Sequence, residues 1–249
     1  MSNVLKIITT ILVVSQPFFS LQAQVNAPKY EIGVAAASFI YQGDLTPNRF
    51  GSFATMRPGI NIHGSKIVSP SFLIRANVAV GGLRGDDGKY DNPEFRKQRN
   101  FNFRSPIAEL SLLLAWNPLG TNYADKGFSP YLFGGAGISF LRIKRDWSNF
   151  NAAYFGDGSD LPNQIAADAA HTLPRVIPVI PVGAGVRYGL TPRIAINAET
   201  SYRLTFTDYL DGFSQAANPS KKDHYQTVSI GAIYRVGKKN MLDCPIVRY

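Results

Sequence analysis

Two segments of the chain alternate between apolar and polar residues. Residues 106–116 (PIAELSLLLAW) and 193–203 (RIAINAETSYR) place apolar side chains on one parity and most of their polar or charged side chains on the other. Successive side chains of a β-strand point to opposite faces, so this period of two predicts strands with one apolar and one polar face. The pattern recurs in eight segments, and the apolar parity ends in aromatic residues. This combination is typical of a transmembrane β-barrel with a polar interior, although a soluble sandwich can show the same period.

The eight segments predict an all-β fold, an eight-stranded antiparallel transmembrane β-barrel of the outer-membrane type. Single-chain bacterial barrels have an even number of strands, with short periplasmic turns and longer outer loops. The connections here alternate long and short, beginning with a long one, so both termini are expected in the periplasm. Pro58, Pro178 and Pro181 fall inside the second and sixth segments and count against regular pairing there, because proline cannot donate to a ladder. The sixth strand is expected to begin later than Ile177 or to bulge near Pro178 to Pro181. The expected strands are 30–41, 55–64, 72–83, 102–117, 129–142, 177–188, 193–205 and 225–236.

The N-terminus has the features of a secretory signal peptide. Lys6 precedes an apolar run over residues 7–19, and Leu21-Gln22-Ala23 precedes a plausible cleavage point before Gln24. No later stretch approaches about 18 consecutive apolar residues, so no transmembrane helix is expected in the mature chain. The expected organisation is a signal peptide over 1–23, an outer-membrane barrel over 24–236 and a periplasmic tail over 237–249.

The chain carries a formal charge of +9 and one cysteine, Cys244. A nucleic-acid partner is not expected for an exported chain whose basic residues are scattered. Anionic lipid and lipopolysaccharide at the rims of the barrel fit this charge better. A single cysteine excludes an internal disulfide, so Cys244 would pair only with another molecule.

Strand parity sorts the side chains into two sets. Aromatic residues on the lipid-facing parity should mark the headgroup level, and they include Phe140 and Tyr202 at the outer end. Charges on the inward parity need partners, and eight strands enclose a space that side chains largely fill. We therefore expect a salt-bridged lumen, with an ion or proton path as the alternative. The expected periplasmic girdle is Tyr30, Phe72, Trp116, Tyr188 and Tyr234, and the expected lumen charges are Glu31, Arg57, Arg75, Glu109, Arg187, Glu199, Arg203 and Arg235.

The search for catalytic or metal-binding chemistry is negative. His63 falls on the inward parity, and His171 and His224 fall in expected outer loops, with no motif that places a serine beside any of them. The run GDDGKYDN over 85–92 has a calcium-loop composition but lacks the spacing and the closing glutamate of an EF-hand, so a solvated polar loop is expected. We expect no catalysis, no metal and no cofactor.

The longest expected outer loop, 145–176, is rich in aromatic residues. It carries Trp147, Phe150, Tyr154 and Phe155, and the next outer loop carries Tyr209, Leu210 and Phe213. Such side chains either pack on the barrel rim or bind a partner. Sequence does not choose between these two interpretations.

Four motifs resemble a known family. YEIGVAAASFIYQGDLTP, RNFNFRSPIAELSLLLAWN, FSPYLFGGAGISF and TFTDYLDGFS occur in this order over nearly the whole mature chain and closely resemble the PorG-like family of small outer-membrane barrels in Bacteroidota. That family typically carries an acidic residue where this chain has Gly212. The resemblance implies a scaffold in the type IX secretion and gliding machinery, which tethers a periplasmic ring lipoprotein and its partner to the outer membrane.

Two regions compete as the partner-binding surface. The tail mixes basic and apolar residues on the expected periplasmic side, and a scaffold would use Met241, Leu242, Cys244, Ile246 and Tyr249, with Cys244 in an intermolecular disulfide. An adhesin or other surface-binding barrel, unrelated to secretion, would use the outer loops instead. An enzyme would depend on His63 or a loop residue and is the least favoured class.

Overall fold

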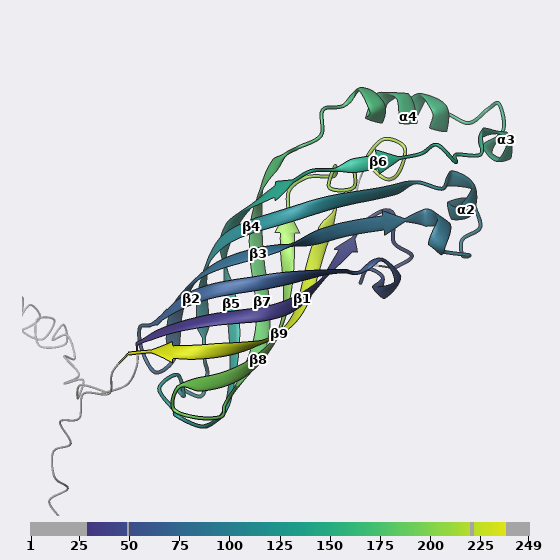
Figure 1. Ribbon diagram of the computed structural model, residues 1–249. Coiled ribbons are helices and arrows are strands. Elements are labelled where there is room, and N and C mark those ends of the chain that lie inside the picture. The colour runs from purple at the N-terminus through teal and green to yellow at the C-terminus, as the bar shows by residue number, and fades with distance from the viewer. Residues whose placement is uncertain (1–28, 49, 220–221, 238–249) are drawn as a thin grey trace, which may run out of the picture. The chain divides into compact units, whose positions relative to one another are not determined.

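The computed structural model describes residues 29–48, 50–219 and 222–237. The expected signal peptide and the five tail residues lie outside these ranges. Eight long antiparallel strands form a closed barrel (Figure 1). They are β1 (Tyr30–Gln42), β2 (Arg57–Ile67), β3 (Phe72–Asp86), β4 (Asn102–Trp116), β5 (Gly127–Leu141), β7 (Val176–Gly189), β8 (Ile194–Thr205) and β9 (His224–Val236).

The barrel closes because every strand pairs with a neighbour on each side, including the pairs β3–β4 and β1–β9. The order around the sheet is β3-β2-β1-β9-β8-β7-β5-β4, and β3 also pairs with β4. The first and last strands, β1 and β9, pair over their whole length from Tyr30↔Val236 to Gln42↔His224. No edge is left in the ring of eight, which removes the unpaired backbone groups that an open sheet exposes. The fold expected from sequence is confirmed.

The proline-containing strands differ from expectation at particular points. β2 begins at Arg57 rather than at residue 55, because Phe53–Thr55 form a short 3-10 turn capped by the Ser52 side chain. Pro58 is the second residue of that strand, where little pairing is lost. β7 runs continuously through Pro178 and Pro181, but its pairing with β5 is interrupted between Val182 and Val179. The strand therefore accommodates Pro181 by losing rungs of the ladder.

The outward face of the barrel is an apolar belt. Along β4 the outward side chains run from Trp116 through Leu114, Leu112, Leu110 and Ala108 to Pro106. Ten residues at about 3.4 Å each, tilted by about 40°, span roughly 25 Å, which is the height of the apolar band of outer-membrane barrels. Leu110, Leu112 and Leu114 are 57%, 61% and 52% exposed, so the belt is uncovered in the isolated chain.

The aromatic residues expected in the periplasmic girdle all lie on the outward face. They are 41–54% exposed and sit at the end of the barrel where β1 begins and β9 ends. Phe72 pairs directly with Trp116. Tyr188 pairs with Phe128, a 57% exposed aromatic that lies one residue before the strand expected over 129–142. The girdle consists of Tyr30, Phe72, Trp116, Phe128, Tyr188 and Tyr234.

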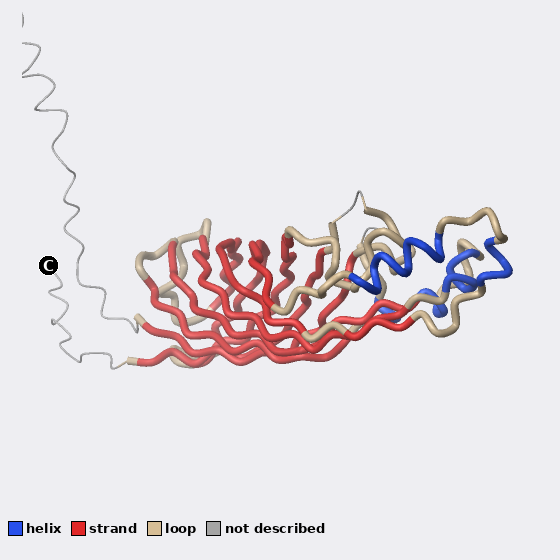
Figure 2. Tube along the Cα trace, turned by 90° about the horizontal axis from the view of Figure 1, so that it is seen from above, coloured by secondary structure: helices blue, strands red, loops and turns tan. Residues whose placement is uncertain are grey.

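The long connections gather at the other end of the barrel, where they form a cap of short helices (Figure 2). The connection between β5 and β7 contains a short strand, β6 (Lys144–Asp146), which extends the edge of β4. Each described helix is too short or too polar to cross a bilayer. The other elements of the cap are η2 (Asp87–Lys89), α2 (Phe95–Arg99), α3 (Ala152–Phe155) and α4 (Leu161–Ala170).

Candidate functional site

The girdle end of the lumen is closed by a carboxylate held between two arginines. Glu31 on β1 accepts from Arg187 Nη1 at 2.8 Å and from Arg235 Nε at 3.3 Å. The same arginines donate to the turn between β4 and β5: Arg235 Nη2 lies 3.2 Å from the Asn122 carbonyl and Arg235 Nη1 lies 2.7 Å from the Ala124 carbonyl. All three charged residues and Asn122 are buried. The two arginines thereby tie the turn to the interior of the barrel at this end.

The middle of the lumen is crossed by a second ion pair. Arg75 Nη1 on β3 lies 2.6 Å from Glu199 Oε1 on β8. β3 and β8 are four places apart in a ring of eight strands, so this pair spans the full width of the barrel. Tyr131 on β5 also donates to Glu199, and the Arg75 guanidinium lies over the Tyr131 ring at 5.5 Å. His63 is buried beside this group.

A third ion pair lies nearer the cap. Arg203 Nε on β8 donates to Glu109 Oε2 on β4 at 3.0 Å, and the Tyr225 hydroxyl donates to the same oxygen at 2.9 Å. Above it lie Phe39, Tyr41 and Leu83, each 0–1% exposed, together with other buried side chains of the larger hydrophobic cluster. Ion pairs at three levels and an apolar layer above them leave a lumen filled with side chains.

The structure places seven of the eight expected lumen charges inside the barrel, and Arg57 is the exception. Arg57 is half-buried at the first position of β2, before the β2–β3 ladder begins at Ile60. Arg57 pairs with the inward-facing Phe39 of β1, so it keeps the inward parity but lies at the capped rim of the lumen and not within it.

Two buried carboxylates hold parts of the cap to one another. Asp168 on α4 accepts hydrogen bonds from the backbone N–H groups of Ser214, Gln215 and Ala216 at 2.9–3.2 Å. Asp87, which is fully buried, accepts from Arg96 Nη1 at 2.8 Å and from Arg99 Nε at 2.7 Å. The solvated loop expected for the run 85–92 is therefore wrong for Asp87, because α2 folds back and supplies two counter-charges.

The outer-loop aromatics pack on one another and on the barrel mouth. Phe213 is buried and stacks on Phe101 at 4.4 Å between ring centroids, and Trp147 meets the edge of Phe213 at 6.1 Å. Phe150 lies 6.2 Å from Phe101. Tyr154 is the most exposed large side chain of the set, at 47%. Of the two interpretations of these two loops, rim packing describes Trp147, Phe150 and Phe213.

Carboxyl groups between β8 and β9 form an acidic cluster under the cap. The Tyr41 hydroxyl lies 2.7 Å from Asp211 and 2.6 Å from Asp223, and the backbone N–H of Leu210 donates to Asp223. Burial raises the pKa of Asp208 to about 6 and raises the pKa values of Asp211 and Asp223 well above the ordinary range. In the unfolded chain these groups titrate near pH 4.

This cluster predicts a cap that is more stable in mild acid. Between about pH 4 and the folded-state pKa, the folded loop binds more protons than the unfolded loop, so its stability falls as pH rises through that pKa. We expect tryptic cleavage at Lys222, normalised to an unfolded substrate, to be slower at about pH 5 than at about pH 7.5. Asp208→Asn should reduce this difference, and Asp157→Asn at an exposed position should not. Equal cleavage at both pH values would contradict the prediction.

Among the described residues, none of the three histidines forms a hydrogen bond with a serine, threonine or tyrosine side chain. His63 lies in the lumen, His171 stacks on the Tyr209 ring at 3.8 Å, and His224 Nδ1 accepts from the Thr205 N–H at 3.3 Å. Within residues 29–48, 50–219 and 222–237, no cluster of three or more His, Cys, Asp or Glu side chains is arranged to hold a metal.

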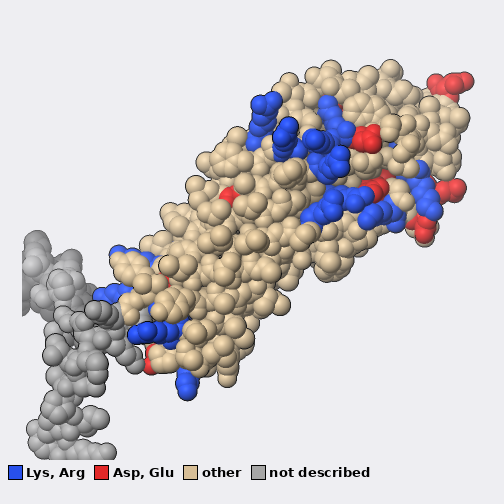
Figure 3. Space-filling view, viewed as in Figure 1, with Lys and Arg blue, Asp and Glu red and all other residues tan. Residues whose placement is uncertain are grey.

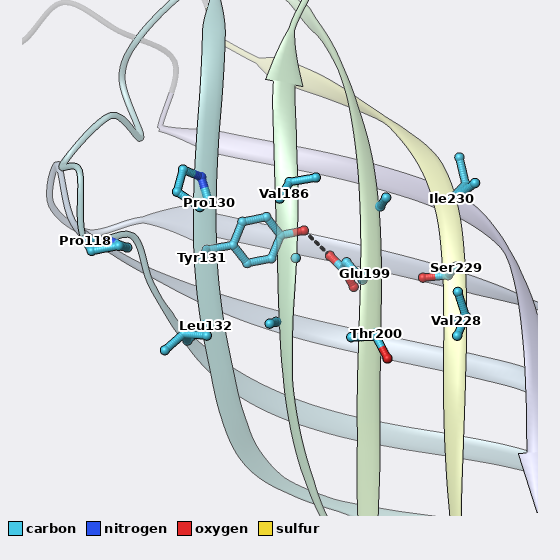
Figure 4. A pocket seen from close by; sticks show the side chains of 13 residues that line it. Pro118, Pro130, Tyr131, Leu132, Val186, Glu199, Thr200, Val228, Ser229 and Ile230 are labelled. Atoms are coloured by element: carbon cyan, nitrogen blue, oxygen red, sulfur yellow. Dashed lines mark hydrogen bonds between the residues drawn. The ribbon is translucent and has the colours of Figure 1, made fainter. Parts of the chain in front are cut away.

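One depression of about 680 Å³ lies in the wall formed by β5, β7, β8 and β9 (Figure 4). Leu132, Val186 and Ile230 line it, and Tyr131 and Glu199 lie in its lining joined by their hydrogen bond. The small residues Ala184 and Gly185 also line it. The depression is continuous with the apolar belt, and its one carboxylate is already committed to Arg75 and Tyr131.

Sequence reasoning missed several residues of these groups. Tyr131 and Tyr225 lie on the inward parity of their strands, so the alternation that identified the charges was also sufficient to find them. Asn122 and Asp168 lie in a turn and in a loop helix, where no periodicity indicates which way a side chain points.

Comparison with known proteins places the chain in a family. No curated protein matches it. Ail, the attachment invasion locus protein of Yersinia pestis, solved with the heparin analogue sucrose octasulfate, is 13% identical, with 84% of this chain and 99% of that chain covered and a TM-score of 0.46. Neisserial surface protein A is 15% identical, with 83% of this chain and 97% of that chain covered and a TM-score of 0.44. OprG from Pseudomonas aeruginosa is 11% identical, with 85% of this chain and 97% of that chain covered and a TM-score of 0.47. The model of the family described as Domain of unknown function (DUF6089) matches residues 5–237, and the chain belongs to that family.

Proposed function

We propose that this chain is an outer-membrane barrel that acts as a non-enzymatic anchor, tethering periplasmic components of the type IX secretion and gliding machinery. The observation that carries the proposal is the closed lumen. Ion pairs cross it at three levels, from Glu31, Glu199 and Glu109, and the cap covers its far end. A barrel filled in this way offers no route for a protein, so its use lies in the surfaces it presents at its two ends.

The apolar belt supports insertion in a bilayer. Large apolar side chains on all eight barrel strands are 37–69% exposed, and the described chain offers no other surface that covers them. In water such an area favours aggregation, whereas in a bilayer it meets acyl chains. The aromatic girdle at one end matches the headgroup level.

The proposed partner lies on the periplasmic side of the membrane. The resemblance to PorG-like barrels supports a ring lipoprotein as the partner, bound through the tail residues Met241, Leu242, Cys244, Ile246 and Tyr249, with Cys244 in an intermolecular disulfide. The outer loops are less suited to this role, because most of their large aromatic side chains are already used in packing the cap.

Affinity purification of the tagged protein from detergent-solubilised native membranes tests the proposal. Wild type should recover periplasmic ring components, and deletion of residues 238–249 should abolish recovery. Cys244→Ser should remove only a reductant-sensitive adduct seen on gels. Shortening loop 145–176 should leave recovery unchanged, which makes it the matched control.

The opposite pattern would overturn the assignment. Recovery that is lost with the shortened loop and kept after the tail deletion would move function to the outer face. Recovery of the barrel by itself from every strain would exclude the anchor role under these conditions.

A further inference from the structure

Three neighbouring outward positions at the capped end of the apolar belt carry cations. The strand register pairs Arg84 on β3 with Arg104 on β4, and Arg104 with Lys144 on β6. Outward side chains that are directly opposite in an antiparallel pair lie about 5 Å apart, and like charges placed in this way destabilise the sheet. A row of three cations is therefore unfavourable unless an anion lies along it.

Nearby carboxylates neutralise only part of this row. Arg84 Nη2 lies 2.8 Å from Asp86 Oδ2, which accounts for one cation. Asp146 lies in the next row on β6, and its Oδ1 accepts the Ser148 N–H at 2.9 Å. Arg104 and Lys144 take part in none of the ion pairs found within residues 29–48, 50–219 and 222–237.

The row continues into a groove of about 670 Å³ lined by Arg142, Lys144 and Arg175. The Arg142 N–H donates to the Pro106 carbonyl, which places Arg142 beside the row on the belt side. Arg145 also lines the groove, but its guanidinium donates to the carbonyls of Gly212 and Ala169 at 2.7 and 3.1 Å and holds the cap. Figure 3 shows Lys and Arg gathered toward the capped end, separated by a broad, nearly uncharged band from those at the opposite end.

The depth of this basic patch, defined as Arg104, Arg142, Lys144 and Arg175, fits a lipid headgroup. On β4, Arg104 is the first charged outward residue after the apolar row that ends at Pro106. A lipid whose headgroup phosphate is bound there would place its acyl chains along the apolar belt. Guanidinium groups match phosphate with paired hydrogen bonds, and several cations in a row suit a headgroup with more than one phosphate.

The geometry points to a binding site for the phosphates of a lipopolysaccharide-type glycolipid in the leaflet that surrounds the capped end. This inference rests on the membrane insertion proposed above and is independent of the secretion role. The patch holds four cations against one nearby carboxylate, Asp146, which accepts the Ser148 N–H and lies in the row next to Arg104. The glycolipid would bridge β4, β6 and the segment before β7, and so fasten the cap to the membrane surface.

The test uses the full mature chain folded in a non-ionic detergent. Native mass spectrometry would measure binding of bisphosphorylated lipid A, of dephosphorylated lipid A and of inorganic phosphate. Wild type should bind the bisphosphorylated lipid, and the variant Arg104→Gln/Arg142→Gln/Lys144→Gln should bind it roughly tenfold or more weakly. The matched control Lys29→Gln/Lys66→Gln/Arg193→Gln removes three exposed charges at the girdle end and should bind as wild type does.

Each outcome decides the proposal. If both variants bound the bisphosphorylated lipid equally weakly, the effect would come from net charge and not from the patch. If wild type bound dephosphorylated lipid A equally well, binding would come from contacts of the acyl chains with the apolar belt. Binding of inorganic phosphate with the same dependence would make the patch a phosphate site and not a lipid site. Heat-modified gel mobility verifies that each variant is folded, so a failure of insertion is distinguished from a failure of the patch. Loss of ring components in the purification experiment would leave these results unaffected.

Discussion

Replacing Glu31 by alanine should lower the free energy of unfolding by about 3–5 kcal/mol. The substitution leaves Arg187 and Arg235 buried with no carboxylate between them, since both donate to Glu31 Oε1. Removing one partner of a buried ion pair is costly because the remaining charge stays out of water. Because two buried guanidinium groups lose their carboxylate at once, this is the largest loss of stability expected from a single substitution in the lumen. Urea-induced unfolding in lipid vesicles, followed by the fluorescence of Trp116 and Trp147, measures it.

Two comparisons isolate the cause. Glu94→Ala removes an exposed carboxylate from the cap and should change the free energy of unfolding by less than about 0.5 kcal/mol. Glu31→Ala combined with Arg187→Met and Arg235→Met removes the whole group and should be less destabilising than Glu31→Ala by itself. If the triple variant were the least stable of the three, the cost would come from lost packing rather than from unpaired charge.

Introducing arginine at Leu112 should destabilise the barrel by about 2–4 kcal/mol in a bilayer. Leu112 is 61% exposed in the middle of the belt, midway between Trp116 and Ala108 on β4. In water, a charged residue at so exposed a position would be nearly neutral or favourable. In a bilayer it carries a charge to the apolar midplane, so the sign of the effect reports which solvent surrounds the barrel.

Leu119→Arg is the matched control for this substitution. Leu119 is 59% exposed, so the change in surface chemistry is nearly the same, but it lies on the turn after β4 and outside the belt. Unfolding in vesicles should show a large loss for Leu112→Arg and little change for Leu119→Arg. Equal effects would mean that the exposed leucines of the belt do not meet acyl chains.

The strands could be predicted because their physical signal is local. On β4, Leu110, Leu112 and Leu114 face outward while Glu109 and Ser111 face inward, and each strand repeats this period. The same parity placed Glu31, Arg75 and Arg203 in the lumen. Parity did not show that Arg57 would be only half-buried, because it does not show that the first residues of β2 lie at the rim, before β3 pairs with this strand.

The pairing of charges could not be predicted from the sequence. Glu199 meets Arg75 across 124 positions of the chain, and nothing local to either residue indicates the partner. The same is true of the cap, where Asp168 reaches the backbone of Ser214 through the fold of two irregular loops. Periodicity indicates a face, whereas partner choice depends on strand order, register and loop geometry, which are properties of the closed ring.

The arrangement of Glu31 and its arginines bears on how the barrel assembles. Glu31 is on the first strand, Arg187 on the sixth barrel strand and Arg235 on the last, so a nascent ring without β9 has only part of this group. A slip of β9 by one residue against β1 would turn Arg235 toward lipid, because side chains alternate between the two faces. The group is completed only when the last strand docks in its correct register. Closure in the correct register is therefore the one that completes the buried charges at the seam, and closure out of register leaves Glu31 without the Arg235 guanidinium.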